Sequence, residues 1–390
     1  MPLFILGSNL RVSVAGCRRD GVSLFTSSSN GPEQAGTHEE DEIRDANGTS
    51  MCMIVRKAGY GRHSMCPKDR FYHFPAGQTP LAAADLRSQE SAMTIETLSI
   101  PARDGFPLGA TAYQPETNPT RTTISIHSAT AVPQRFYRTL AGYLAQNGYR
   151  VVTYDYRGTG ASRPASLRGF KTRACDWALQ DMAGVVDWVR STDRPQRHFL
   201  IGHSIGGQLV GLLPNGHLID AMVTLSSQSG YWRLQGGMQK IAVAFHVHIT
   251  LPLMAHLFGY MPWSWIGSAE DLPKGFALDW SRWCRQPGYL LDDDRLPVDR
   301  YRQFQAPVLA YSFDDDNWGT RRAVDAMMGA YPHVTRRHVR PADIGRPGIG
   351  HFGYFRPGAE RLWQAAIDWL EGVVPLAPGD GSVHSASLRR

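Results

Sequence analysis

The stretch Gly202-His203-Ser204-Ile205-Gly206 carries more information than any other part of this sequence. It follows the apolar run 199–201 and precedes the helix-like stretch 207–213. This context predicts a sharp strand-to-helix turn that pushes the serine hydroxyl out of the fold, with glycines where a side chain would collide with neighbouring backbone. The N–H of Ile205 then points at the same spot, where it can stabilise an oxyanion, helped by the positive end of the following helix.

A serine on such a turn needs an acid and a histidine, which we expect later in the chain, each just after a further strand. The acid candidates follow the apolar strand 307–313, where Asp314, Asp315 and Asp316 are consecutive. Three adjacent carboxylates repel one another, so only one of them can easily be the partner. A solvated turn or a helix N-cap before Arg321 is the alternative interpretation of this segment.

The predicted base is His351, which lies in the glycine-rich loop 345–356 ahead of the amphipathic helix 362–370. A loop histidine with glycines on both sides can swing its ring between the serine and the acid. His203 is the neighbour of the serine, so we expect it to line the pocket rather than to act as base. Trp318 and Phe352 are further candidates for the pocket wall.

An earlier strand, 122–127, ends in a loop of small residues that is followed by a helix-like stretch. This loop is the expected source of the second oxyanion donor, from Ser128 or Ala129, with His127 beside the pocket. An ordinary strand-to-helix connection is the alternative. Asp155 follows the next strand but precedes the serine, so we interpret it as a structural turn residue.

Together these segments resemble the α/β-hydrolase superfamily, and within it the serine aminopeptidase-like and esterase-like branch of predicted hydrolases. The resemblance spans about 94–372 and is strongest in 154–160, 202–206, 312–318 and 349–356. In related hydrolases the acid falls three residues after the residue that closes its strand. Phe313 occupies that closing position here, so the resemblance implies Asp316 as the acid, with Asp315 second. Ser128 stands where many relatives place glycine, and its side chain can alter the turn of the oxyanion loop.

The predicted fold class is α/β, with a mostly parallel central sheet flanked by helices, because short apolar runs alternate with helical patterns. We expect the hydrolase domain to span 93–372. About 80 residues separate the strand 221–225 from the acid strand, which predicts a helical cap insertion at about 228–303. The aromatic and apolar residues of this insertion suggest a substrate with an acyl or aromatic portion.

The two ends of the chain have a different character. Residues 1–92 are rich in serine and glycine and show no sustained period, so we expect an N-terminal extension that is largely disordered. They hold 10 basic and 10 acidic side chains, so the formal charge of +6 belongs to the remainder. Translation from Met93 is an alternative start. We expect 373–390 to form a flexible tail.

Composition excludes several classes of function. No arginine-rich run with interleaved aromatics is present, so we predict no nucleic-acid binding despite a pI near 9.1. We find no run of about 18 apolar residues and predict no membrane span. Five scattered cysteines fit a reducing compartment, and we predict a cytoplasmic protein. No metal or organic cofactor is implied, because a serine, histidine and aspartate triad works unaided.

The sequence therefore predicts a serine hydrolase in which Ser204 attacks a carbonyl, His351 carries the proton and Asp316 orients the imidazole. Carboxylic esters are the first choice of substrate. An aminopeptidase or amidase is the alternative within enzymes, and it would need an acidic cluster in the insertion, for which Asp292-Asp293-Asp294 is the candidate. A catalytically inactive binding protein is the alternative from another class. The oligomeric state is not predicted.

Overall fold

The computed structural model describes residues 41–44, 50–53, 93–117, 119–265, 267 and 269–375. The chain divides into two units, Met1–Thr79 and Pro80–Arg390. In the first unit, β1 (Asp41–Arg44) and β2 (Ser50–Met53) form an antiparallel pair. The rest of the expected N-terminal extension and most of the expected C-terminal tail lie outside the described residues.

The second unit is built on an eight-stranded sheet with the order β12-β11-β8-β7-β5-β6-β4-β3. Five of its seven neighbouring pairs are parallel, and β4 is antiparallel to both of its neighbours. The α/β fold with a mostly parallel central sheet is therefore confirmed. The strands are β3 (Met93–Pro101), β4 (Pro107–Pro115), β5 (Thr122–His127), β6 (Arg150–Tyr154), β7 (Arg197–His203), β8 (Ala221–Leu225), β11 (Val308–Phe313) and β12 (Val334–Val339).

The central strands differ from the edges in burial. Every residue of β5, β7, β8 and β11 is buried, whereas β3 exposes six of its nine residues and β12 three of its six. Parallel strands covered on both faces are buried along their whole length, and here this includes polar residues such as Ser125 and His127 of β5. The carboxyl ends of β7, β8 and β11 meet at one edge of the sheet, which is the edge that carries the site.

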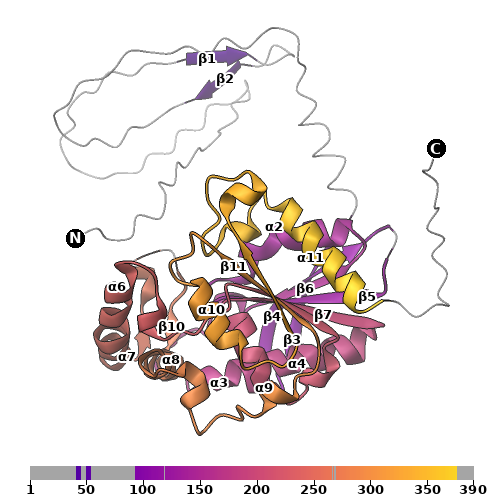
Figure 1. The fold of residues 1–390 in the computed structure, drawn as a ribbon. Coiled ribbons are helices and arrows are strands. Elements are labelled where there is room, and N and C mark those ends of the chain that lie inside the picture. Colours follow the sequence, from indigo (N-terminus) through magenta and orange to yellow (C-terminus); the bar gives the residue numbers. More distant parts are fainter. Residues whose placement is uncertain are drawn as a thin grey trace, which may run out of the picture. The chain divides into compact units, whose positions relative to one another are not determined.

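Helices cover both faces of the sheet (Figure 1). On one face lie α2 (Arg138–Gln146) and α11 (Glu360–Val373), which share a hydrophobic core with that side of the strands. A second core lies on the other face and includes side chains of α4, α9 and α10. The helices on that face are α3 (Ala174–Asp176), α4 (Ala183–Trp188), α9 (Arg300–Gln303) and α10 (Arg321–Met328). The short α5 (Ile205–Gln208) begins directly after Ser204.

The segment between β8 and β11 forms helices and two short strands, which lie to one side of the sheet in Figure 1. A π-helical turn, His246–Thr250, joins α6 and α7 into one helical run. The carbonyl of Val247 in this wider turn accepts a hydrogen bond from the Ser281 hydroxyl of α8 at 2.6 Å. The elements are α6 (Gln239–Phe245), α7 (Leu251–Phe258), β9 (Tyr260–Met261), β10 (Leu272–Pro273) and α8 (Lys274–Arg285).

The helical run Gln239–Phe258 is the most apolar helix that the described residues form. It has a mean hydropathy of 1.7 over an 18-residue window and is long and apolar enough to cross a membrane by length and composition. Lys240, His246 and His248 interrupt its apolar residues, so it contains no continuous apolar run of that length. Its inner face packs on the protein through Val243, Val247, Leu251 and Ala255, each at most 4% exposed.

A buried cation anchors the end of β6. The guanidinium of Arg157 donates to Asp181 at 2.6 Å and, on its other side, to Asp104 at 2.6 and 2.7 Å. The side chain of Asp181 is fully buried, whereas that of Asp104 is 41% exposed. The two carboxylates therefore bind the same cation in very different surroundings.

We predict that Asp181→Ala lowers the free energy of unfolding by about 3 kcal/mol, because it leaves a buried cation short of a partner. Asp104→Ala is the matched control and should cost about 1 kcal/mol or less, since water replaces an exposed carboxylate. Urea denaturation of the two variants measures both values. Equal losses would contradict the argument.

Candidate active site

Ser204 lies at the turn between β7 and α5, with φ 51° and ψ −118°. A positive φ is strained for any residue with a side chain, so the surrounding structure must hold it. Its N–H donates to the carbonyl of Leu225 at the end of β8 at 2.9 Å, and its carbonyl accepts from the N–H groups of Gly207 and Gln208. The residue is 7% exposed and lines a cavity.

Glycines allow the close approach that this turn requires. A Cβ on Gly206 would overlap the carbonyl of His127, and one on Gly202 would lie 2.6 Å from Cα of Gly207. Both contacts are with backbone, which cannot rotate aside as a side chain can. The glycines on either side of the serine are thus needed for packing, as the pattern indicates.

The predicted acid and base are in contact. Nδ1 of His351 lies 2.8 Å from Oδ2 of Asp316, whose other oxygen accepts the N–H groups of Trp318 and Gly319. Burial raises the pKa of Asp316, but the charge and hydrogen bond of His351, with the N–H of Gly319 and the Ser226 hydroxyl, outweigh it and lower the pKa to about 2. The carboxylate therefore stays ionised at neutral pH. The hydroxyl of Ser204 has no hydrogen-bond partner among the described residues.

The neighbouring Asp315 has a different task. Its two carboxylate oxygens accept the N–H groups of Ile349 and Gly350 at 2.8 and 2.9 Å. These N–H groups belong to the loop that carries His351. Asp315 thus holds the histidine loop, and Asp316 contacts the imidazole itself.

A chain of hydrogen bonds joins three loops around Ser204. Nε2 of His203 lies 2.9 Å from the carbonyl of His351, so this nitrogen carries the proton. Burial, and then the charge of His351, hold the pKa of His203 well below its usual range, so its Nδ1 accepts from the Tyr137 hydroxyl at 2.9 Å. The Tyr137 oxygen in turn accepts the N–H of Ala129 at 2.8 Å. The sequence showed no signal for Tyr137, because these contacts exist only after folding.

Several expected site residues lie elsewhere. The N–H of Ala129 is committed to Tyr137 and is not free for an oxyanion. Ser128 is 1% exposed, and Thr130, which we did not single out, is the residue of this loop that lines the cavity. The small-residue pattern of the loop could have indicated it. Asp155 accepts the N–H groups of Gln134 and Ala161, in keeping with a structural turn residue.

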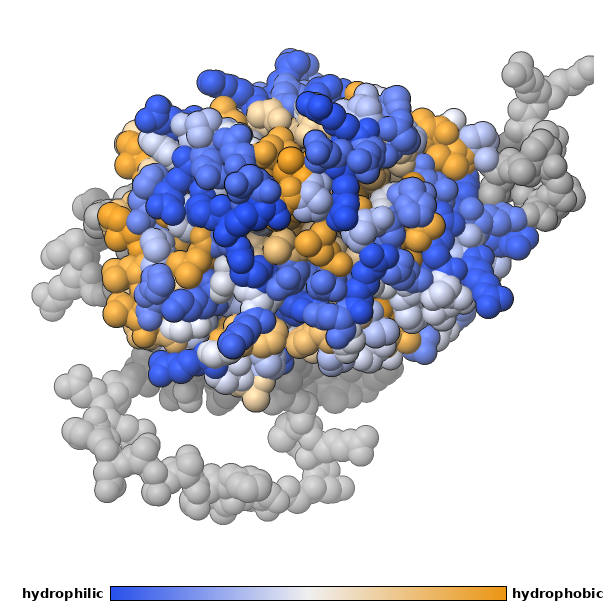
Figure 2. All heavy atoms as spheres, turned by 90° about the horizontal axis from the view of Figure 1, so that it is seen from below, coloured by the Kyte–Doolittle hydropathy of each residue, from blue (hydrophilic) through white to orange (hydrophobic). Residues whose placement is uncertain are grey.

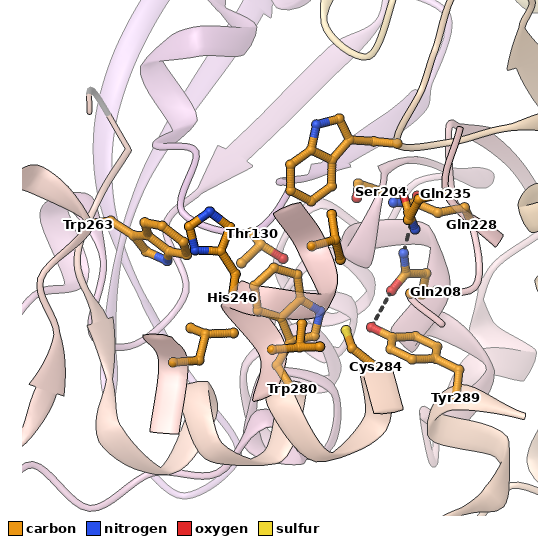
Figure 3. A pocket seen from close by; sticks show the side chains of 15 residues that line it. Thr130, Ser204, Gln208, Gln228, Gln235, His246, Trp263, Trp280, Cys284 and Tyr289 are labelled. Carbon is orange, nitrogen blue, oxygen red and sulfur yellow. Dashed lines mark hydrogen bonds between the residues drawn. The ribbon is translucent and has the colours of Figure 1, made fainter. Parts of the chain in front are cut away.

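The cavity beside Ser204 is narrow, about 40 Å³, with room for a few waters. Its ends differ: glutamines gather around Ser204, while Trp263 and His246 lie at the far end (Figure 3). The Tyr289 hydroxyl donates to Gln208 at 3.0 Å, and Gln208 donates to Gln228 at 3.4 Å. The lining residues are Thr130, Ser204, Gln208, Gln228, Gly230, Gln235, Val243, His246, Val247, Leu251, Trp263, Trp280, Cys284, Tyr289 and Trp318.

Of the four expected wall residues, Trp318 lines the cavity. His127 and His203 do not, because both rings are fully buried beneath the loops. Phe352 also lies outside the lining and instead packs its ring against His351 and His203, with centroids 5.1 and 5.6 Å apart. Aromatic character alone did not distinguish a pocket wall from the packing behind the histidine loop.

Buried histidines make the stability depend on pH. Burial lowers the pKa of His127 to about 3 and that of His198 well below its usual range, as it does for His203. The unfolded chain regains the ordinary value and takes up a proton on each ring below about pH 6.5. Burial also raises the pKa of some aspartates, including Asp181 to about 7 against the opposing charge of Arg157, and these act in the opposite direction.

We predict that the free energy of unfolding falls by about 2 kcal/mol between pH 6.5 and 5.0, because three histidines outweigh the opposing aspartates. Urea denaturation at the two pH values measures it. His198→Asn should lower the number of protons that the chain takes up on unfolding by about one, since an amide does not titrate. A protein that is equally stable or more stable at pH 5.0 would rule the explanation out.

Part of the chain matches a known family. Residues 119–261, a little over a third of the chain, match the family described as serine aminopeptidase, S33. A curated relative named as the carbamate hydrolase RutD, from Variovorax paradoxus, is 44% identical over 78 residues, which make up 20% of this chain and 26% of the relative. The match therefore spans about a quarter of that relative's length.

Two solved structures of low sequence identity are also similar. The esterase domain of a Rhodothermus marinus protein is 18% identical with a TM-score of 0.47, over 71% of this chain and 98% of that one. The esterase Est1E of Butyrivibrio proteoclasticus, solved with ferulic acid, is 17% identical with a TM-score of 0.48, over 70% and 98%. The strand order and the turn at Ser204, together with the match of residues 119–261, show that this chain has the α/β-hydrolase fold.

Proposed function

We propose that the protein is a serine hydrolase that cleaves a carboxylic ester of a small, partly apolar substrate through an acyl-enzyme. The observation that carries this proposal is the strained turn that places Ser204 on a cavity wall, at the sheet edge where His351 contacts Asp316. Strained backbone and a buried carboxylate that orients an imidazole are typical of nucleophilic catalysis.

In the proposed reaction the Ser204 oxygen attacks the ester carbonyl while Nε2 of His351 takes its proton. The tetrahedral intermediate collapses with cleavage of the ester C–O bond, and the alcohol leaves with the proton from His351. A water then attacks the acyl carbon, His351 again takes a proton, and the acid is released as Ser204 regains it. Asp316 holds the imidazole in one tautomer and stabilises its charged form.

The oxyanion would lie at the head of α5. The N–H of Ile205 is the first proposed donor, because it follows the nucleophile and begins the helix. For the second donor we propose the N–H of Thr130, since this residue lines the cavity and the N–H of Ala129 is already bonded. The N–H of Ser128, which the sequence also suggested, is the other candidate for the second donor.

The cavity favours an ester over a peptide with a free amino terminus. No carboxylate is among the lining residues that the structure describes, so a substrate ammonium would have no counter-ion there. None of the three acids suggested for that purpose lines the cavity, and the buried one, Asp293, already binds Arg282, Arg295 and Trp283. The aminopeptidase alternative therefore lacks its recognition group.

The cavity also suggests the form of the substrate. Aromatic and aliphatic side chains at one end suit an apolar portion. At the other end Oε1 of Gln235, a residue only 6% exposed, has no partner among the described residues. A buried acceptor without a partner favours a ligand that supplies an N–H or O–H group. The proposed substrate thus combines an apolar part with a hydrogen-bond donor near the scissile bond.

The proposed compartment is the cytoplasm. Cys175 and Cys284 are free thiols, and Cys284 also lies in the cavity wall. Free thiols are the common state in a reducing compartment.

We predict that a fluorophosphonate probe labels the wild type and Ser191→Ala, a surface control, but not Ser204→Ala. The kcat/KM for aryl esters should fall by about 10⁴-fold or more in Ser204→Ala, because the nucleophile is lost. A series of acyl chains, together with a carbamate and an amide, measures the size and type of substrate. Equal labelling of Ser204→Ala would refute the assignment.

We predict that Asp316→Asn lowers kcat by about 10³ to 10⁴-fold, because an amide does not hold the reactive tautomer of His351. Asp315→Asn is the matched control, one residue away. It should lower kcat by about tenfold or less, since its amide oxygen still accepts one N–H of the histidine loop. Steady-state kinetics on one aryl ester compare the two variants, and a larger effect for Asp315→Asn would reverse the assignment.

A further inference from the structure

Exposed hydrophobic side chains concentrate on one element of this protein. Among the described residues nine large hydrophobic side chains are exposed, and seven of them lie between 238 and 265. Figure 2 shows hydrophobic surface gathered at its left edge, on the side where Figure 1 places α6 and α7. We call these seven residues the apolar stripe. They are Met238, Ile241, Phe245, Ile249, Leu253, Leu257 and Trp265, which are 47 to 77% exposed.

The first six members of the apolar stripe follow one another at intervals of three or four residues, with Met238 directly before the helical run Gln239–Phe258 and the other five along it. In a regular α-helix a repeat of four drifts by about 40° per step, because one turn holds 3.6 residues. The wider π-helical turn at His246–Thr250 offsets part of this drift. The side chains thus stay on the outer face of the helix, opposite the buried residues that line the cavity.

In the part of the chain that the structure describes, the charges beside the apolar stripe that have no partner of opposite charge are positive. Lys240 is the sole charged residue from 238 to 265, and it is exposed. Arg168 donates to the carbonyl of Phe258 at the end of α7. The two acids that follow the stripe, Glu270 and Asp271, are paired with Arg135 and Arg163. The surface is therefore apolar with a positive rim.

The apolar stripe and its positive rim distinguish between three candidate partners for this surface: a second copy of the chain, the interior of a membrane and an anionic lipid surface. A second copy of the chain would bring like charges together around the apolar stripe. A transmembrane arrangement would strip the helix from the protein, although its inner face forms part of the cavity wall. An anionic lipid surface matches both the hydrophobic side chains and the positive rim, and a helix that is apolar on one face lies in the plane of such a surface.

We propose that the apolar stripe docks the protein on an anionic lipid surface, with α6 and α7 lying in the interface and Trp265 at its edge. The same helical run separates this surface from the cavity, since its inner side chains Val243, Val247 and Leu251 line the cavity wall. Docking places the cavity next to the lipid phase. An apolar substrate can then reach Ser204 without crossing water.

Flotation of the full chain with vesicles of 30% phosphatidylglycerol and 70% phosphatidylcholine tests the proposal. We expect binding that weakens at least tenfold on pure phosphatidylcholine and also weakens in high salt, because the positive rim contributes. Phe245→Asn with Leu257→Asn should weaken it at least tenfold. The matched control is Ile95→Asn with Val373→Asn, which removes the two large exposed hydrophobic side chains that the described part of the chain carries outside the stripe and should bind like the wild type.

Flotation requires no turnover, so Ser204→Ala should float like the wild type even if the proposed hydrolase activity fails. Circular dichroism checks that the stripe variant is folded. The proposal is overturned if the wild type stays with the soluble fraction at low salt, or if the control variant loses as much binding as the stripe variant. It is also overturned if light scattering shows a dimer that the stripe variant alone dissociates, which would make the stripe an interface between copies.

Discussion

The strained backbone at Ser204 is the constraint on which the rest of this structure depends. A positive φ directly after β7 turns the chain into α5, and it requires a glycine at 206, where a side chain would overlap the carbonyl of His127. That contact presses the end of β7 against the end of β5. The strain is held because the neighbouring strands are buried and their ladders are complete, so the turn cannot relax without disturbing the sheet.

Parallel strands explain why distant parts of the chain meet at this turn. Their carboxyl ends lie at one edge, so the loops after β5, β7, β11 and β12 are neighbours although many residues separate them. Hydrogen bonds then connect them: Ala129 to Tyr137, Tyr137 to His203, and His203 to the carbonyl of His351. The site is therefore positioned by backbone groups, by neutral rings and by the carboxylate of Asp315, and the ionised Asp316 is the buried charge that contacts the imidazole.

The helical run Gln239–Phe258 connects the cavity with the protein surface. Its inner face packs over the cavity and its outer face carries the apolar stripe. This helical run thus has two apolar faces: the protein buries one of them and leaves the other exposed. This explains both its high hydropathy and the low fraction of it that the fold buries. It also links the proposed hydrolysis of an apolar ester to the proposed lipid surface.

The sequence by itself determined the α/β fold and the turn at Ser204, because glycine spacing and apolar runs are local properties of the chain. Only the tertiary structure decided that Asp316 contacts His351 while Asp315 holds its loop, since adjacent carboxylates are equivalent until strands bring their partners. It also decided that His203 is buried and that the N–H of Ala129 is engaged. Which face of an apolar helix stays exposed depends on the residues that pack against it, and these belong to elements that are distant in the sequence.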